Sequence, residues 1–130
     1  MNENGMLNLG HKNLDVWKLS IELVTKIYAI TENFPKTEMY GITNQLRRAA
    51  VSVSSNIAEG AARRSQLERR RYYEIARSSL VEIDTQLEIA LRLKFCIREN
   101  LHSISDLLNH VFASLSKLVK STIHKTLTKN

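Results

Sequence analysis

The chain has 130 residues, of which 43% are hydrophobic and 6% aromatic, with one proline and a single cysteine, Cys96. This size and composition fit one domain with one core, and they favour long helices over a protein of strands and turns. Nineteen basic against thirteen acidic residues give a formal net charge of +6, which attracts polyanions, and the lone cysteine excludes an internal disulfide and fits a reducing compartment.

The chain begins with a polar segment, residues 1–12, that lacks a periodic pattern and is predicted to be a flexible tail. It contains no apolar run of signal-peptide length, and no stretch reaches the roughly 20 apolar residues of a membrane span. We therefore expect a cytoplasmic protein that does not associate with a membrane.

The first helical pattern follows Asn13. Two neighbouring apolar rows predict a core helix, with Trp17, Ile21, Val24 and Tyr28 in one row and Leu23, Ile27, Ile30 and Phe34 in the other. Asn13 or Asp15 can cap its start, and Phe34-Pro35 is predicted to end it because proline disfavours helical geometry in the preceding residue.

A second helix is predicted from Gly41, with Gly60 as a left-handed terminator. Its expected buried positions are Ile42, Leu46, Ala49, Val53 and Ile57. Ser65 and Glu68 form a capping box that predicts the start of a third helix. The seam of this third helix steps by three and four residues through Tyr73, Ala76, Leu80, Ile83, Leu87 and Ala90.

A fourth helix is predicted from the same kind of spacing, through Leu101, Ile104, Leu108, Val111, Leu115 and Leu118. The segment from Ser116 to Asn130 is basic and is expected to fray. Four helices with short connectors predict an all-α, antiparallel up-down-up-down four-helix bundle. The expected organisation is a flexible tail over 1–12, the bundle over 13–126 and a second tail over 127–130.

Eight arginines and three glutamates lie between residues 47 and 77. Arginine binds phosphate through a planar fork and stays charged, so this cluster predicts contact with an RNA or DNA backbone. The candidate contacts are Arg47, Arg48, Arg63, Arg64, Arg69, Arg70 and Arg71, with Tyr72 placed to stack on a base. The alternative is a solvated helix face whose arginines pair with Glu68 and Glu74 at helical spacing.

The second helix carries small residues where most helices carry bulky ones: Ala49, Ala50, Ser52, Ser54, Ser55 and Ala58. Small residues suit a tight helix contact, either within the monomer or with a neighbouring subunit, and we expect self-association. Asn56, Glu59 and Glu82 are predicted to be structural polar residues. Glu82 is expected to be buried and paired with Arg47 or Arg48.

No catalytic constellation is evident. The sequence has no Gly-rich phosphate loop, no plausible Ser-His-Asp set and no sign that Cys96 is activated. A bundle di-metal site needs two Glu-x-x-His motifs, whereas Glu99 and His102 form only one. We therefore expect a protein that is not an enzyme and has no metal or cofactor.

Several segments together resemble the four-helix-bundle family of 23S rRNA intervening-sequence proteins. The matching segments are Asp15-Val16-Trp17-Lys18, Phe34-Pro35 with Tyr40-Gly41, Gln45-Leu46-Arg47-Arg48-Ala49, Ser55-Asn56-Ile57-Ala58-Glu59-Gly60, and Ala76-Arg77-Ser78-Ser79-Leu80-Val81-Glu82 running into Gln86-Leu87. The chain is also similar to the accessory variability protein of diversity-generating retroelements. The resemblance implies a ring-shaped homo-oligomer, typically a pentamer, and a nucleic-acid or reverse transcriptase partner.

The chain departs from the family pattern at two places. It has Ser78-Ser79-Leu80 where the family usually has Gly-Ser-Leu, and Lys94-Phe95-Cys96 where the family usually has Gly-Tyr-Leu. The second change removes the glycine expected after the third helix, so that helix is expected to end differently or to run on. The leading hypothesis is a ring-forming bundle that binds nucleic acid by charge. The alternatives are an oligomeric module that docks an acidic protein without nucleic acid, and a stand-alone monomer.

Overall fold

The computed structural model describes residues 6–128, except for the side chains of Asn13 and residues 124–128. Within this range every regular element is a helix. The long helices are α1 (Asp15–Thr31), α2 (Ile42–Ala62), α3 (Gln66–Arg92) and α4 (His102–Thr128). Short 3-10 helices precede α1, α2 and α4: η1 (Gly10–Asn13), η2 (Lys36–Glu38) and η3 (Arg98–Leu101).

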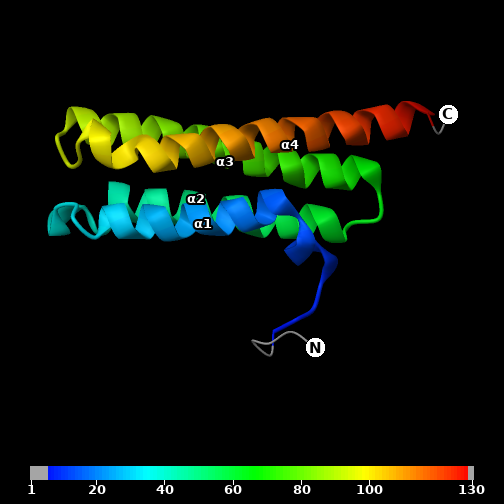
Figure 1. Cartoon of the computed structure of the whole chain (residues 1–130), viewed down its shortest axis with the longest axis horizontal. Helices are drawn as coiled ribbons and strands as arrows, with labels where there is room; N and C mark the ends of the chain where they lie inside the picture. The colour runs from blue at the N-terminus through cyan, green and yellow to red at the C-terminus, as the bar shows by residue number, and fades with distance from the viewer. Residues whose placement is uncertain (1–5, 129–130) are drawn as a thin grey trace.

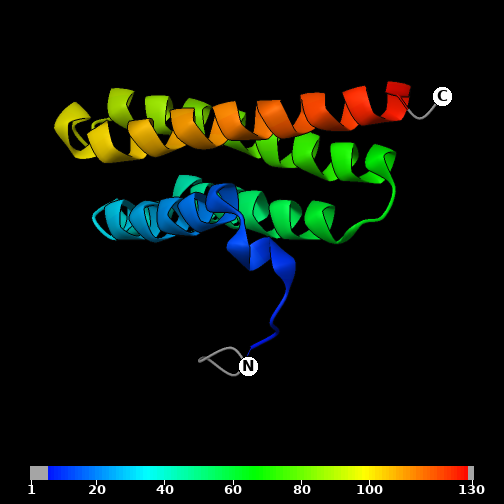
Figure 2. The same cartoon turned by 45° about the vertical axis from the view of Figure 1, so that its right-hand side comes forward.

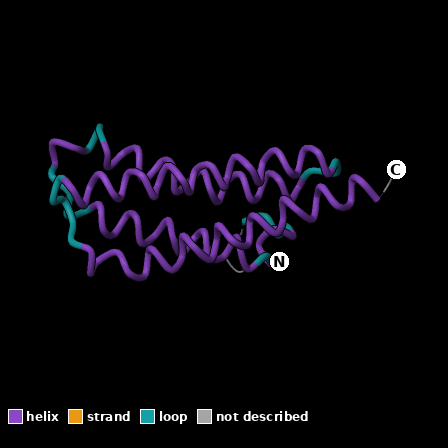
Figure 3. Tube along the Cα trace, turned by 90° about the horizontal axis from the view of Figure 1, so that it is seen from above, coloured by secondary structure: helices purple, strands orange, loops and turns teal. Residues whose placement is uncertain are grey.

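The long helices pack as an antiparallel bundle. Each contacts the next along the chain, and α4 closes on α1. Figure 1 shows α1 and α2 in one layer and α3 and α4 in the other, and Figure 3 shows all of them extended along the same axis. The α2–α3 turn lies at the end where α1 begins and α4 finishes, and the other two connections lie at the opposite end. The predicted up-down-up-down four-helix bundle is confirmed.

The cores of α2 and α3 follow the sequence pattern closely. All six predicted seam residues of α3 are buried, and Leu46, Ala49, Val53 and Ile57 of α2 are buried with Ile42 half-buried. A hydrogen bond between the hydroxyls of Ser52 and Ser79, at 3.0 Å, and one from Gln86 Nε2 to Gln45 Oε1, at 3.4 Å, join the two antiparallel helices. Because Ala49, Ala50 and Ser54 are also buried, much of the small-residue face packs inside the monomer.

The prediction for α1 was wrong on one side. Leu23, Ile27 and Phe34 are buried, but Ile21 and Tyr28 of the other apolar row are 38% and 41% exposed. Ser20 and Thr31 occupy core positions instead. Their hydroxyls donate to the carbonyls of Trp17 and Ile27, at 2.6 and 2.7 Å, so these polar groups are satisfied inside the bundle.

The ends of α1 also differ from the prediction. The N-cap residue is Leu14, with no side-chain cap bond, so Asp15 does not cap the helix, and the side chain of Asn13 lies outside the described part of the chain. The helix ends at Thr31, and a turn carries the chain to Phe34 and Pro35. Phe34 still faces the core, where its ring centroid lies 5.7 Å from that of Phe95 beyond α3.

The sequence predicts that Gly60 ends α2 in a left-handed conformation, and this prediction was wrong. The helix continues to Ala62, and Gly60 is buried against Tyr73 of α3. A Cβ at this position would lie 2.8 Å from Tyr73 Cε1. The glycine is therefore explained by the close approach of an aromatic ring rather than by backbone conformation.

The left-handed position belongs to Lys94, whose φ is 63°. The Lys94 amide donates to the Leu91 carbonyl at 3.0 Å, and the Phe95 amide donates to the Ala90 carbonyl at 2.9 Å. These two bonds are the Schellman pattern of a helix C-terminus. α3 therefore ends as it would with glycine, contrary to the expectation drawn from the missing glycine.

The seam of α4 is shifted relative to the prediction. Leu101, Ile104, Val111 and Leu115 are buried as expected, whereas Leu107 and Val119 replace Leu108 and Leu118, which are half-buried. The helix is apolar on both flanks, so its periodicity does not distinguish the two registers, and the packing of α1 and α3 decides between them. α4 then continues to Thr128, past the point where the sequence predicts fraying. Residues 1–5 and 129–130 of the predicted tails lie outside the described range.

Candidate nucleic-acid interface

The charges of the bundle are distributed unevenly along its length. We call "basic half" the part that contains the α2–α3 turn, residues 10–23, 53–79 and 114–123, and "balanced half" the remainder, residues 24–52 and 80–113. The basic half has ten lysines and arginines and five carboxylates. The balanced half has seven of each. The excess positive charge of the described side chains therefore lies in the basic half.

Five of the predicted arginines, including Arg64, are in the α2–α3 turn or the first turns of α3. Arg63 follows the last residue of α2, and Arg69, Arg70 and Arg71 follow the Ser65 cap of α3. This cap is confirmed, because the Glu68 amide donates to Ser65 Oγ at 3.3 Å. The Ser65 cap thus places three consecutive arginines on the first turns of a well-defined helix, where their side chains point in different directions.

Arg63 is held by neighbouring side chains. Its Nη2 donates to Glu59 Oε2 at 2.9 Å and to the Tyr72 hydroxyl at 3.0 Å. Its guanidinium also lies over the Tyr72 ring, 4.8 Å from the centroid. Arg63 therefore joins α2 to α3, and it covers one face of the tyrosine that the sequence predicts to stack on a base.

Arg69 closes the end of α2. Its Nε donates to the Arg63 carbonyl at 2.6 Å. A cation at this position is favourable, because the last carbonyls of a helix carry partial negative charge and lack partners within the helix. The contact also fixes the position of the Arg69 guanidinium in the basic half.

Arg70 and Arg77 face α4. Arg70 Nε donates to Thr122 Oγ1 at 3.4 Å, and Arg77 Nη1 donates to Ser116 Oγ at 3.3 Å. The Arg77 guanidinium also lies 5.9 Å from the centre of the Phe112 ring. These two arginines therefore contribute charge to the basic half from within the α3–α4 contact.

Three of the candidate arginines are exposed: Arg48, Arg64 and Arg71. None of them forms a hydrogen bond or ion pair with another residue in the described part of the chain. Arg64 and Arg71 belong to the basic half, and Arg48 belongs to the balanced half. Arg64 and Arg71 are therefore the arginines best placed to contact an external anion.

The predicted pairing of Glu82 with Arg47 or Arg48 was wrong. Glu82 is exposed on α3, and Arg47 faces α1 instead. Arg47 Nε donates to Thr31 Oγ1 at 2.9 Å, and its Nη2 lies 3.3 Å from Glu32 Oε1. Arg47 is thus a structural residue, as the pairing hypothesis expects, but its partners are on and just after α1 instead of on α3. The pairing failed because Arg47 lies on the side of α2 that faces α1, whereas Glu82 is exposed on α3.

The other two predicted polar residues, Asn56 and Glu59, form bonds with residues of α2 or with the residue that follows it. Asn56 is half-buried and its Nδ2 donates to the Ser52 carbonyl at 2.8 Å. Ser52 in turn meets Ser79 of α3. Glu59 is exposed and forms the ion pair with Arg63. Asn56 therefore acts within its own helix, and Glu59 acts through Arg63, the residue that follows that helix.

Two further features of this region are not predicted by the sequence. Tyr73, predicted only as a seam residue, lies beside the α2–α3 turn, and burial raises its pKa while the charge of Arg69 partly opposes that shift. Leu9, His11 and Leu14 come to the same end of the bundle through η1. Their clustering depends on the path of the chain before α1, which no periodic pattern encodes.

The described residues contain neither a cluster of metal-ligating side chains nor a helix suited to crossing a membrane. Among the described residues, no three histidine, cysteine, aspartate or glutamate side chains come together as a metal site would require. In the same part of the chain, no helix combines the length and apolarity needed to cross a bilayer.

The sequence family of the chain is established by a family model. The model for 23S rRNA-intervening sequence proteins matches residues 12–117. The chain belongs to this family. The match confirms the resemblance seen in the first three helices and extends it into α4.

A solved structure supports the same fold. The crystal structure of a protein of unknown function from the S23 ribosomal protein family of Bacteroides thetaiotaomicron matches with a TM-score of 0.72 and 23% sequence identity. The match covers 81% of this chain and 98% of that one. At this level of identity the likeness shows the fold alone. No curated protein shows significant similarity to the chain.

Proposed function

We propose that the protein is a non-enzymatic homo-oligomer that binds nucleic acid through its basic half. The observation that carries the proposal is the uneven charge of the bundle, with ten cationic side chains and five carboxylates in the basic half and equal numbers elsewhere. A phosphate backbone is a linear array of negative charges, and proteins neutralise it with clustered arginine and lysine side chains.

The exposed arginines supply the contacts. Arg64 and Arg71 keep their guanidinium groups available, whereas Arg63 and Arg69 are held in place by neighbours. Phosphate contacts of this kind position a nucleic acid without reading its sequence. Binding is therefore expected to depend strongly on salt and weakly on base sequence.

The test is a fluorescence anisotropy titration with labelled RNA and DNA between about 50 and 200 mM salt. Replacing both arginines, as Arg64→Gln with Arg71→Gln, should weaken binding to every sequence and reduce the salt slope by about two, one for each lost phosphate contact. The matched control is Arg92→Gln with Arg98→Gln, which removes the same charge from the balanced half and should leave the slope unchanged.

The outcomes separate the hypotheses. Absence of RNA and DNA binding at about 50 mM salt, where such contacts are strong, contradicts the proposal. Equal losses from the two pairs of substitutions indicate that net charge alone matters. Capture of an acidic protein that depends on Arg64 and Arg71, without nucleic-acid binding, supports the alternative of a protein-docking module. A reverse transcriptase partner stays a prediction from the resemblance.

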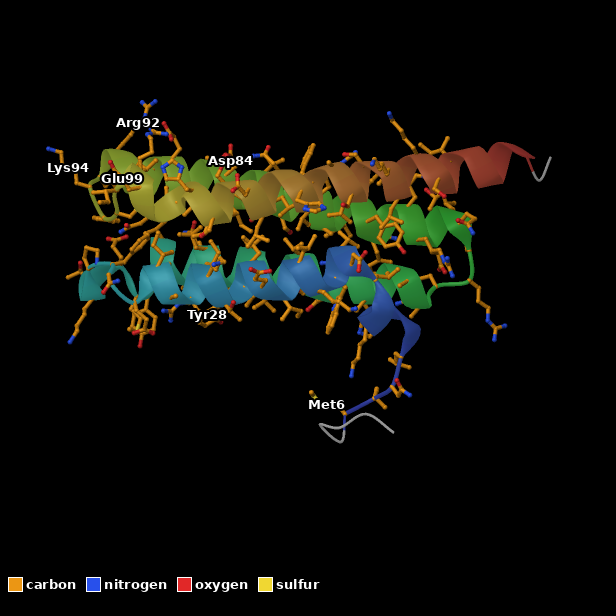
Figure 4. All side chains as sticks on the ribbon, viewed as in Figure 1. Met6, Tyr28, Asp84, Arg92, Lys94 and Glu99 are labelled. Atoms are coloured by element: carbon orange, nitrogen blue, oxygen red, sulfur yellow. The ribbon has the colours of Figure 1, made fainter. Side chains whose placement is uncertain are left out.

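The oligomeric part of the proposal draws on exposed apolar side chains. Ile21, Tyr28 and Val51 are exposed on α1 and α2, and Val81 and Phe112 are exposed on α3 and α4. Figure 4 shows Tyr28 on the side of α1 that points away from α3 and α4. Two distinct apolar faces suit the head-to-tail contacts of a closed ring. Light scattering should give a multiple of 14.9 kDa, five-fold for a pentamer, and a mass of 14.9 kDa would remove the ring.

A further inference from the structure

A cavity of about 510 Å³, partly open to solvent, lies in the basic half between η1, the end of α2, the first turns of α3 and Leu118 of α4. Most of its lining is apolar, including Leu9, Leu14 and Ala62, and Arg69 and His11 contribute polar groups. Its volume is within the range of roughly 300–1,000 Å³ typical of ligand pockets, which are also mainly apolar with a few placed polar groups. Figure 2 shows η1 beside the end of α2, outside the main bundle.

Tyr73 gives the cavity an aromatic wall. The residue is only 4% exposed, and its ring lies against Gly60, where a Cβ would come within 2.8 Å. The glycine at the end of the Asn-Ile-Ala-Glu-Gly segment therefore permits this position of the ring. Because the ring is packed on one side, its orientation is set before any ligand enters.

The cavity also has charge at its edge. Arg69 lines it, and the bond from Arg69 Nε to the Arg63 carbonyl fixes the guanidinium there. The exposed Arg64 and Arg71 are on the neighbouring α2–α3 turn and the first turns of α3. A ligand that complements this region has an apolar or aromatic part for the cavity and negative charge for the arginines.

We propose that the cavity accepts an unstacked base of a single-stranded nucleic acid whose phosphates lie on the basic half. The inference rests on the proposed function and adds a preference within it. In a duplex the bases are paired and stacked, so they are not available to the cavity. In a single strand a base can turn out, and its apolar faces can contact aromatic and aliphatic side chains whatever its identity.

The test compares two labelled single strands of about 10 nucleotides, a length within the usual range of single-strand sites. One is oligodeoxythymidine, and the other has abasic tetrahydrofuran units in place of every nucleoside, so the phosphates are the same and the bases are absent. The wild-type protein should bind the strand with bases about tenfold more tightly, because contact with one base is worth that order of affinity.

A variant locates the effect. Ala62→Phe places a ring at the exposed edge of the cavity without changing charge, and it should remove the tenfold difference while affinity for the abasic strand stays the same. Ala29→Phe, at an exposed position of α1 in the balanced half, is the matched control and should preserve the difference.

The results distinguish this inference from the proposed function. Equal affinity of the wild-type protein for both strands, with strong salt dependence, overturns the cavity inference and leaves phosphate binding intact. A difference that survives in Ala62→Phe also overturns it, because the base must then contact another surface. Absence of binding to either strand at about 50 mM salt overturns both proposals.

Discussion

The C-termini of α2 and α3 lie at opposite ends of the bundle and are capped in different ways. At the α2–α3 turn, arginines close the helix end: Arg69 donates to the Arg63 carbonyl, and Arg63 stacks on Tyr72. At the α3–α4 turn, the backbone closes it through the left-handed Lys94 and the Schellman bonds. Figure 4 shows Lys94 with Arg92 and Glu99 at this end.

The two caps lie in regions of different charge. The arginine contacts at the α2–α3 turn belong to the basic half, and the backbone cap at Lys94 belongs to the balanced half. The structural role and the proposed binding role therefore share one region. Arg63 and Arg69 are committed mainly to the fold, and their exposed neighbours Arg64 and Arg71 remain available for a ligand.

The close packing of Gly60 in the basic half predicts the largest effect on stability. Gly60→Ala should destabilise the protein by about 2 kcal/mol, because the added Cβ meets the buried Tyr73 ring and the cost of overpacking exceeds the gain in helix propensity. Chemical denaturation measures the change in the free energy of unfolding. Gly10→Ala is the control, since nothing lies within 4 Å of its added Cβ. A Gly60→Ala protein as stable as the wild type would contradict the packing explanation.

Two adjacent arginines of the balanced half provide the next test. Arg47→Met should cost about 1 kcal/mol, because it removes the bond to Thr31 and the contact with the Tyr28 ring, 4.6 Å from the guanidinium. Arg48→Met removes the same charge from an exposed position and should change stability by less than about 0.5 kcal/mol. Equal effects in thermal or chemical unfolding would mean that charge, and not the contact with α1, is responsible.

The backbone cap of α3 predicts a smaller effect of opposite sign. Lys94→Gly should stabilise the protein by about 0.5 kcal/mol, because glycine adopts a φ of 63° without the cost paid by a residue that has a Cβ, and this gain exceeds the added entropy of the unfolded chain. Lys94→Ala keeps the unfavourable conformation and serves as the control. If both variants shift the denaturation midpoint equally, the lysine side chain matters more than its φ.

The smallest expected effect concerns Cys96, near the same turn. Burial raises the pKa of its thiol, so less thiolate is present at a given pH in the folded protein than in the unfolded chain. The pH profile of alkylation by iodoacetamide should therefore lie at higher pH for the folded protein than for the protein in denaturant. Because the folded-state pKa is raised, the associated stability is present below the unfolded pKa and is lost as pH rises through the folded value. Coincident profiles would contradict this direction.

The prediction of the fold succeeded where the apolar pattern was unambiguous. The α3 seam from Tyr73 to Ala90 has apolar or small residues at every third or fourth position, and the residues between them are polar except for Ile75, Val81 and Ile89, so one face is clearly the most apolar. The pattern was ambiguous in α1 and α4, which are apolar over wide arcs. There the neighbouring helices selected Leu107 over Leu108 and left Ile21 and Tyr28 exposed.

The sequence predicted which arginines make up the candidate site, but not which of them bond to other residues of the chain and which remain exposed. The run of arginines from Arg63 to Arg71 is visible in the sequence, and the capping box at Ser65 locates it at a helix start. The partners of Arg70 and Arg77 are on α4, 52 and 39 residues away, so local spacing could not indicate them. The same reason explains the wrong partner for Arg47, because the sequence does not tell which flank of α2 faces α1.

The sequence by itself determined the helices, their antiparallel order, the family and the position of the basic cluster. These follow from periodicity, short connectors and local composition, which act over a few residues. The tertiary structure alone decided which arginines are structural, why Gly60 is a glycine, and that η1 and Tyr73 line a cavity beside the exposed arginines. Such features arise from contacts between distant segments, whose geometry depends on how all four long helices pack together.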